Sequence, residues 1–333
     1  MHDQQTTDRT KIMVLRVMRW KTKSRIQNTI SLLPSSLSYA TYYWIQRHFG
    51  GLRKVSPIRR FEAAVSTWRL IKELGHDPTN KVFLEVGTGR VPAVPLAYWL
   101  MGAKSTATID LNPYMRAELV ADSLDYISGN KDELLKVFGS FVDKSRFEYL
   151  LNFHKNAAFS IDAFLRLFQI NYIAPGNAAD TKLIDQSIDF HTSYTVFEHI
   201  PPGTLNAILE EGNRLISDDG LFVHRIDYSD HFSHSDKEIS AINFLRFTDS
   251  EWNRYAGNRY MYMNRLRHDD CLAIFESAGH EILLARPDVD QRSLNLLRQG
   301  NFQVDDRFKA KSESVLSITG SWIVSRNKGP VNV

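Results

Sequence analysis

Two glycines and two carboxylates are the residues of this sequence whose types and spacing first suggest chemistry. Gly87 and Gly89 follow a short run at 82–86, apolar except for Glu85, that is typical of a buried strand. Glycines at the end of such a strand let the backbone turn sharply and approach a ligand without interference from a Cβ atom. Asp110 follows a second strand-like run, about 20 residues further on, where nucleotide-binding βαβ units place a carboxylate that accepts hydrogen bonds from ribose hydroxyls. The spacing therefore predicts a site for an adenosine cofactor.

The turn itself helps to distinguish NAD, FAD and S-adenosylmethionine, which all carry that ribose. A dinucleotide-binding fold needs G-x-G-x-x-G, whereas this chain has Pro92 at the last of these positions. Glu85 would repel a pyrophosphate but attract a sulfonium cofactor that carries an amino group. Here the chain resembles the class I S-adenosylmethionine-dependent methyltransferases, whose first motif is acidic-x-G-x-G. The third glycine of many members is Val91 in this chain, and the resemblance extends from Lys81 to Ser325.

A second part of the resemblance lies at 187–200. The strand-like SIDFHTSY and the TVFEHI that follows it are similar to the fourth motif of the family, in which a D-x-x-x-S strand precedes V-L-E-H-I. The family also places an acidic residue near the adenine amino group. Asp180 matches that residue, with a turn-forming role as the alternative. The resemblance implies that S-adenosylmethionine contacts Glu85, Gly87, Thr88, Gly89, Asp110, Leu111, Asp180, Ser193 and Tyr194.

Methyl transfer to a hydroxyl needs a base that removes the proton, and histidine is the usual side chain for this task. Our first candidate is His231, at the end of a predicted strand, with Asp230 or Asp227 to orient it. We include His199 as a further catalytic candidate. His191 and His234 are rivals, and each histidine has the alternative of making a structural hydrogen bond only. Asp230, His231 and His234 also offer ligand atoms for a divalent ion, but their spacing is too unspecific for the sequence to predict a metal site.

The chain has 333 residues, of which 43% are hydrophobic and 24% are charged, which is an ordinary composition. The single cysteine, Cys271, excludes an internal disulfide framework and a cysteine-based zinc site, and is consistent with a reducing compartment. No apolar run reaches 18 residues, and no signal-peptide pattern opens the sequence, so we expect neither a membrane span nor a signal peptide. We therefore expect a cytoplasmic protein.

Charge is distributed unevenly along the chain. The net charge is +3, yet residues 9–61 contain twelve lysines and arginines and no acidic residue, so the remainder is net negative. We treat residues 1–57 as a basic, largely helical extension. Its mixture of basic and apolar residues is consistent with an amphipathic helix at the anionic inner face of a membrane, or with a helix that caps the main domain. Nucleic acid is an unlikely partner, although tyrosines and a tryptophan accompany the basic residues.

Residues 58–333 are expected to form the S-adenosylmethionine-binding domain. We predict an α/β fold: a doubly wound, mostly parallel, seven-stranded sheet of the Rossmann-like methyltransferase type, with an antiparallel last strand. Residues 127–170 read as inserted helices that form a lid or an oligomer surface. Residues 228–267 form an expected acceptor-side insertion, whose aromatic side chains, with Arg265 and Arg267, are suited to sugar rings or flat acceptors. The predicted strands are 82–86, 106–109, 171–174, 187–194, 221–226, 280–285 and 315–325.

The function that these features predict is S-adenosylmethionine-dependent O-methylation of a sugar or another small hydroxylated acceptor. The overall pattern resembles bacterial methyltransferases associated with polysaccharide synthesis. The alternatives are a lipid or quinone methyltransferase at a membrane surface, and a catalytically silent cofactor-fold protein that binds a membrane or nucleic acid. An NAD-dependent oxidoreductase fits less well, because of Pro92 and the match at 189–200. Each of these predicted functions is compatible with a homo-oligomer.

Overall fold

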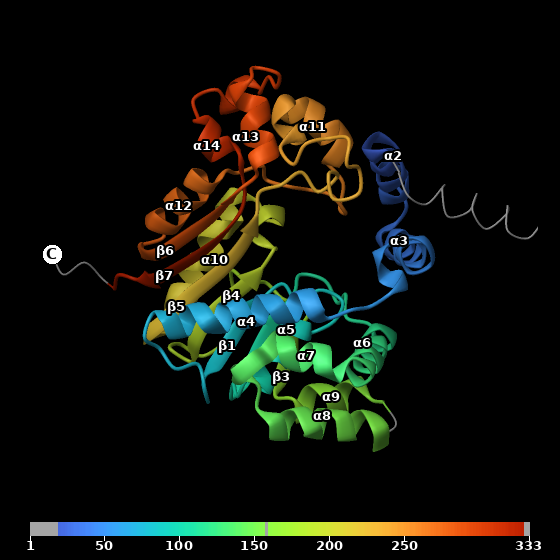
Figure 1. Cartoon of the computed structure of the whole chain (residues 1–333), viewed down its shortest axis with the longest axis vertical. Helices are drawn as coiled ribbons and strands as arrows, with labels where there is room; N and C mark the ends of the chain where they lie inside the picture. Colours follow the sequence, from blue (N-terminus) through green and yellow to red (C-terminus); the bar gives the residue numbers. More distant parts are fainter. Residues whose placement is uncertain (1–18, 157–158, 330–333) are drawn as a thin grey trace, which may run out of the picture. The chain divides into compact units, whose positions relative to one another are not determined.

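The computed structural model describes residues 19–156 and 159–329 (Figure 1). The chain folds into two compact units, each built from segments that are separated in the sequence. Within the described residues, unit 1 comprises 19–54, 227–271 and 287–321, and unit 2 comprises 55–156, 159–226, 272–286 and 322–329. Residues 19–54 of the basic extension and the acceptor-side insertion, which are separate segments in the sequence, thus belong to the same unit.

A seven-stranded sheet with the strand order β3-β2-β1-β4-β5-β7-β6 forms the framework of the molecule. Its first five strands in this order are parallel neighbours, and β7 is antiparallel. This topology confirms the predicted α/β Rossmann-like methyltransferase fold. The strands are β1 (Val82–Val86), β2 (Ser105–Ile109), β3 (Ile170–Ile173), β4 (Ile188–Tyr194), β5 (Ile216–Asp227), β6 (His280–Val289) and β7 (Ile318–Asn327).

Successive residues of a strand point to opposite faces of the sheet. In unit 2, helices cover both of these faces. On β5, Leu221 and Val223 join the large apolar core that includes Trp68 of α4, whereas Phe222 packs against Gly212 of α10. The helical segments of unit 2 are α4 (Ile58–Glu73), α5 (Ala93–Leu100), α6 (Ala117–Gly129), α7 (Lys131–Phe138), η2 (Gly139–Phe141), α8 (Lys144–Asn156), α9 (Ile161–Leu167), η3 (Phe197–His199) and α10 (Pro202–Leu215). Helix α12 (His268–Ser277) begins in unit 1 and continues in unit 2.

The described residues of the segment 127–170 are largely helical. Phe138, Phe147, Phe164 and Phe168 are almost completely buried in the core of unit 2. The insertion therefore contributes side chains to the apolar core of this unit.

Unit 1 has its own apolar core, which joins the N-terminal helices to the acceptor-side insertion. Trp20 packs against Phe232 and Tyr255, with ring centroids 5.6 and 4.8 Å apart. The Ser24 hydroxyl donates a hydrogen bond to the carbonyl oxygen of Tyr255 at 2.7 Å. The helical segments of unit 1 are α2 (Trp20–Ser31), α3 (Ser35–Phe49), η1 (Gly51–Arg53), η4 (Asn243–Arg246), α11 (Asp249–Ala256), α13 (Gln291–Arg298), η5 (Asp306–Phe308) and α14 (Glu313–Leu316).

The two arginines of the insertion that we expected to meet a sugar are buried instead. Arg267 is fully buried and donates hydrogen bonds to the carbonyl oxygens of Tyr228, Leu316 and Ile318. Arg265 donates to backbone carbonyls of η4 and the residue that follows it. A guanidinium offers five donors in a rigid fork, so it is well suited to hold several carbonyls of irregular chain together. These arginines stabilise the backbone of unit 1.

Within the two described ranges, no helix is long and apolar enough to cross a membrane.

Candidate cofactor and acceptor sites

The glycine turn connects the carboxyl end of β1 to α5, and its two glycines are required for different reasons. Gly87 has φ +92°, and a Cβ atom there would lie 2.3 Å from Cγ2 of Val196, which is an impossible contact. Gly89 has φ +69°, but an added Cβ would meet nothing within 4 Å. Gly87 thus allows the turn to pack against the segment after β4. Gly89 lies beside open space that a ligand can occupy.

Asp110 lies next to this turn, as its spacing predicts. The backbone N–H of Gly89 donates a hydrogen bond to Oδ2 of Asp110 at 2.9 Å, and the N–H of Asn112 donates to Oδ1 at 3.3 Å. Burial raises the pKa of the Asp110 carboxyl above its ordinary value, although these N–H groups act in the opposite direction. The carboxylate is therefore fixed at the carboxyl end of β2, where a ribose would meet it.

Glu85 is a buried carboxylate held by a pair of threonines. Only 2% of its surface is exposed, and the hydroxyl of Thr108 donates to its Oε2 at 2.8 Å. The hydroxyls of Thr88 and Thr108 lie 2.6 Å apart, so Thr88 can donate to Thr108 while Thr108 donates to Glu85. Burial raises the pKa of Glu85 to about 8. A cationic ligand group beside this carboxylate would favour its ionised form, which is the complementarity that an amino-bearing sulfonium cofactor needs.

Thr108 is a site residue that sequence reasoning did not name. In the sheet, Thr108 is the register partner of Glu85 across β1 and β2. Register partners present their side chains on the same face of a sheet. Aligning the two predicted strands would therefore have indicated a threonine beside Glu85.

The other predicted cofactor residues are more dispersed. The Ser193 hydroxyl lies 2.8 Å from Nδ1 of His224 inside the sheet, and the guanidinium of Arg60 lies 5.2 Å from the ring of Tyr194. Asp180 is half exposed and forms an ion pair with Lys182 at 2.7 Å. Leu111, next to Asp110, is 72% exposed. The structure thus brings together Glu85, Gly87, Thr88, Gly89 and Asp110, and the cofactor-binding roles of all nine residues stay predictions.

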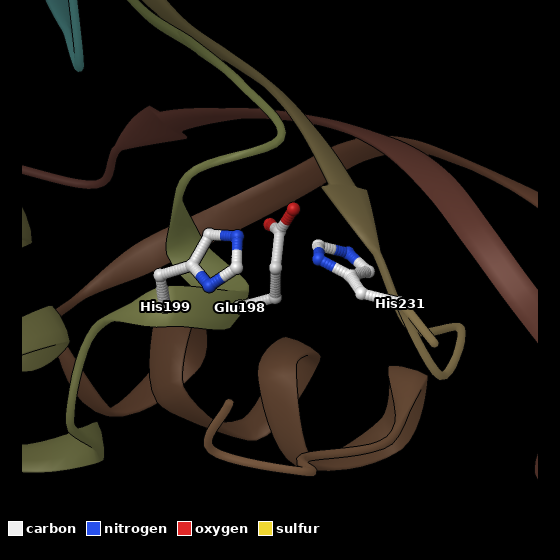
Figure 2. A group of neighbouring side chains, drawn as sticks. All are labelled: Glu198, His199 and His231. Atoms are coloured by element: carbon white, nitrogen blue, oxygen red, sulfur yellow. The ribbon is translucent and has the colours of Figure 1, made fainter. Parts of the chain in front are cut away.

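The candidate acceptor-side residues follow β4 and β5. Because these strands are parallel neighbours, the segments after them leave the sheet from the same edge. Figure 2 shows that Glu198 and His199 come from η3, after β4, and that His231 comes from the loop after β5. Glu198 is buried and His199 is exposed. The catalytic roles of His199 and His231 stay predictions.

A carboxylate close to His231 is that of Asp227, the last residue of β5. Its Oδ2 lies 3.4 Å from Nε2 of His231 and 3.7 Å from Nε2 of His234. Asp230, our other candidate for orienting His231, is fully buried and accepts hydrogen bonds from the N–H of Phe232 and the side-chain amide of Asn243. The geometry therefore favours Asp227 as the partner of His231 and gives Asp230 a role in holding the loop.

His191 lies far from solvent within unit 2. It is 1% exposed on β4 and its ring packs against Phe222 and His224, with centroids 5.1 and 5.2 Å apart. Burial lowers its pKa to about 3, so the imidazole is neutral at physiological pH. These surroundings are those expected of a histidine with a structural role.

No protein-family model matches this chain, and no curated protein matches it. Solved structures do match. The chain is similar to an S-adenosylmethionine-dependent methyltransferase from Methanosarcina mazei, with 12% identity and a TM-score of 0.41, covering 77% of this chain and 96% of that one. It is also similar to phosphoethanolamine N-methyltransferase 2 from Haemonchus contortus, with 12% identity and a TM-score of 0.43, covering 85% of this chain and 59% of that one. At these identities and TM-scores the likeness is descriptive, and function has to be argued from the site.

Proposed function

We propose that this chain binds S-adenosylmethionine and transfers its methyl group to a hydroxyl of a sugar or another small acceptor. The observation that carries the proposal is the buried Glu85 carboxylate beside the Gly87–Gly89 turn and the fixed Asp110 carboxylate. These groups follow β1 and β2 at the edge where ligands bind in open parallel sheets. A turn with Pro92 and a buried carboxylate is unsuited to a pyrophosphate, which argues against a dinucleotide.

Each group has a distinct part in holding such a cofactor. Asp110 would accept hydrogen bonds from the ribose hydroxyls, and Gly89 leaves room for the ligand to lie against the backbone. Glu85, kept in place by Thr108, would attract the positively charged amino end. The bound cofactor supplies a methyl group on a positively charged sulfur. The protein then has to align the acceptor with that group and exclude competing water.

A hydroxyl acceptor must lose its proton as its oxygen takes the methyl group. The loop after β5 is the candidate for this step, because it carries His231 beside the carboxylate of Asp227. A carboxylate at this position can fix the tautomer of the imidazole. A sugar acceptor, and a place in polysaccharide synthesis, rest on the sequence resemblance. The burial of Arg265 and Arg267 removes one of the features that favoured a sugar.

Calorimetry with the Asp110→Ala variant tests the cofactor site. Hydrogen bonds to a charged acceptor contribute about 1.5–3 kcal/mol, so we expect affinity for S-adenosylmethionine to fall about tenfold or more. Asp219→Ala is the matched control, because Asp219 is exposed near the opposite end of β5. Unchanged affinity in a folded Asp110→Ala protein would refute the site. A catalytically silent binder would be recognised by the absence of heat with the wild-type chain.

We also propose that the N-terminal helices bind an anionic membrane surface. Large apolar side chains are exposed on and beside α3: Leu32 (85%), Leu37 (52%), Trp44 (53%) and Phe49 (59%). Lys21, Arg25, Arg53 and Lys54 are exposed in the same part of unit 1, which has no acidic residue between 19 and 54. Basic and apolar side chains together fit an interface of anionic headgroups and acyl chains. This surface would suit a lipid-linked acceptor as well as a soluble one.

A further inference from the structure

Three side chains that can bind a metal lie close together at the end of β5 and in the loop after it. Asp227, His231 and His234 each offer one ligand atom, and these atoms lie within 4.8 Å of one another. Oδ2 of Asp227 is 3.4 Å from Nε2 of His231 and 3.7 Å from Nε2 of His234. All three residues belong to unit 1, so the cluster is a property of that unit alone.

These distances lie in the range expected for two ligands of one ion. Two ligands that are each ~2.1 Å from a tetrahedral metal lie roughly 3.4 Å apart. A charge-assisted hydrogen bond between an imidazole and a carboxylate is shorter, at about 2.7–2.9 Å. The spacing of the Asp227 carboxylate from both imidazoles is thus compatible with a shared metal ion, which at His234 would replace the 2.9 Å contact between Nε2 and the Ser229 hydroxyl.

The carboxylate of Asp227 is also oriented for this task. Both the backbone N–H and the hydroxyl of Ser229 donate hydrogen bonds to Oδ1, at 2.8 and 2.6 Å. Oδ2, the other oxygen, is the one that lies near the two imidazoles. Partners of this kind, which hold the ligands of a metal, commonly change metal affinity 10- to 100-fold when they are removed.

The chain on either side of His231 is held by buried contacts. Asp230 accepts hydrogen bonds from the Phe232 N–H at 2.8 Å and from Asn243 at 3.1 Å, and its own N–H donates to the Ala241 carbonyl at 2.6 Å. Phe232 is fully buried, and its ring packs against Trp20. Because both neighbours of His231 are fixed, its imidazole is positioned before any ion arrives, which lowers the entropic cost of binding.

We propose that Asp227, His231 and His234 form a binding site for a divalent transition-metal ion. Two imidazole nitrogens and one carboxylate oxygen suit Zn²⁺, Mn²⁺, Fe²⁺ or Co²⁺. They fill three positions and leave at least one for water or a substrate oxygen, which is the arrangement of a catalytic rather than a structural metal site. Ser229 and Asp230 are positioning residues of this site.

One extension of this proposal rests on the proposed methyltransferase function. With an ion bound, His231 is a ligand and no longer a proton acceptor. A hydroxyl acceptor on the open position would have its pKa lowered by the ion, and its proton would pass to water as the oxygen is methylated. The metal would then replace the general base, and turnover would depend on the ion.

The test is titration of Co²⁺ and Zn²⁺ into the full-length, untagged protein, followed by visible absorption for Co²⁺ and by calorimetry for Zn²⁺. We expect one equivalent to bind, with a Co²⁺ spectrum of low coordination number. His234→Gln should weaken binding at least tenfold, and because the His234 side chain is 54% exposed the variant should fold normally. Asp227→Asn should weaken it further, and Ser229→Ala should weaken it 10- to 100-fold.

The matched control is His154→Gln, which removes another histidine that pairs with an aspartate, Asp125, at 2.9 Å in unit 2. This variant should bind the metals like the wild type. The proposal is overturned if the wild type binds neither ion, or if His234→Gln and Asp227→Asn bind as tightly as the control. Calorimetry with S-adenosylmethionine on the same samples keeps the two proposals separate, because cofactor binding can persist when metal binding fails.

Discussion

At the scale of single residues, the buried carboxylate of Glu85 has the most direct consequence. Its pKa is raised to about 8 by burial, so the folded ligand-free protein prefers the protonated form well above the usual range of a glutamate. The unfolded chain ionises near the ordinary value of 4.5. The contribution of Glu85 to stability is thus fully present below about pH 4.5 and is lost as the pH rises toward 8.

Glu85→Gln should abolish this pH dependence. The difference in the free energy of unfolding between variant and wild type should move in favour of the variant between pH 5.5 and 8, by on the order of 1 kcal/mol per pH unit. Denaturant unfolding at several pH values measures it, with Glu62→Gln on the exposed face of α4 as the control. A difference that stays constant with pH would contradict a raised pKa at Glu85.

Several site residues could be predicted from the sequence because their roles depend on local spacing. Gly87, Gly89 and Asp110 follow strands, and the ends of neighbouring parallel strands meet at one edge of the sheet. Arg265 and Arg267 were misjudged, because their surroundings depend on residues far away in the sequence. Nothing near an arginine in the sequence reveals whether distant carbonyls will surround it.

At the scale of elements, β4, β5 and β6 bury three histidines in unit 2. His191, His224 and His280 are each at most 1% exposed. Burial lowers the pKa of His191 to about 3 and that of His280 to about 4, and it places that of His224 well below its ordinary value. The neighbouring histidines depress the pKa values of His191 and His224 further, and Glu211 opposes this for His191. These strands therefore need neutral imidazoles.

Acid should destabilise unit 2 through these strands. A depressed pKa gives stability that is present above the unfolded value of 6.5 and is lost as the pH falls toward 3–4. His191→Gln should therefore lose less stability than the wild type between pH 6.5 and 4.5, although it is less stable at pH 7. Fluorescence-monitored unfolding measures this, with the half-exposed His76→Gln as the control. Equal losses in all three proteins would exclude the role of His191.

The boundaries of some strands could not be predicted from local sequence patterns. Strand β5 begins at Ile216, ahead of the predicted strand 221–226, and has an irregular register opposite Ile188 and Phe190. Strand β6 continues to Val289 through exposed residues without an apolar pattern. Both extensions depend on a neighbouring strand, which the local sequence does not contain. The apolar runs of β1 and β2, in contrast, were sufficient to predict them.

At the scale of the whole molecule, the proposed membrane surface of α2 and α3 predicts binding to vesicles. Full-length protein should sediment with vesicles that contain phosphatidylserine and stay in solution with phosphatidylcholine alone. Binding should weaken with salt, because the Debye length falls from ~10 Å at 0.1 M to ~3 Å at 1 M.

Two variants separate the charged and apolar contributions to this surface. Lys21→Glu with Arg25→Glu should reduce binding at low salt, and Trp44→Ala should reduce it at every salt concentration. The control is Lys104→Glu, at an exposed position of unit 2. If the wild type does not bind anionic vesicles at low salt, the N-terminal helices serve only to pack within unit 1.

The central claim, that the glycine turn and its two carboxylates bind S-adenosylmethionine, is tested most directly by calorimetry of the wild-type protein. Separate titrations with S-adenosylmethionine and with NAD compare the two cofactor classes at one site. The account predicts saturable binding of one S-adenosylmethionine per chain and no heat from NAD, because Pro92 stands where a dinucleotide-binding turn needs a glycine. Saturable binding of NAD with no response to S-adenosylmethionine would contradict it.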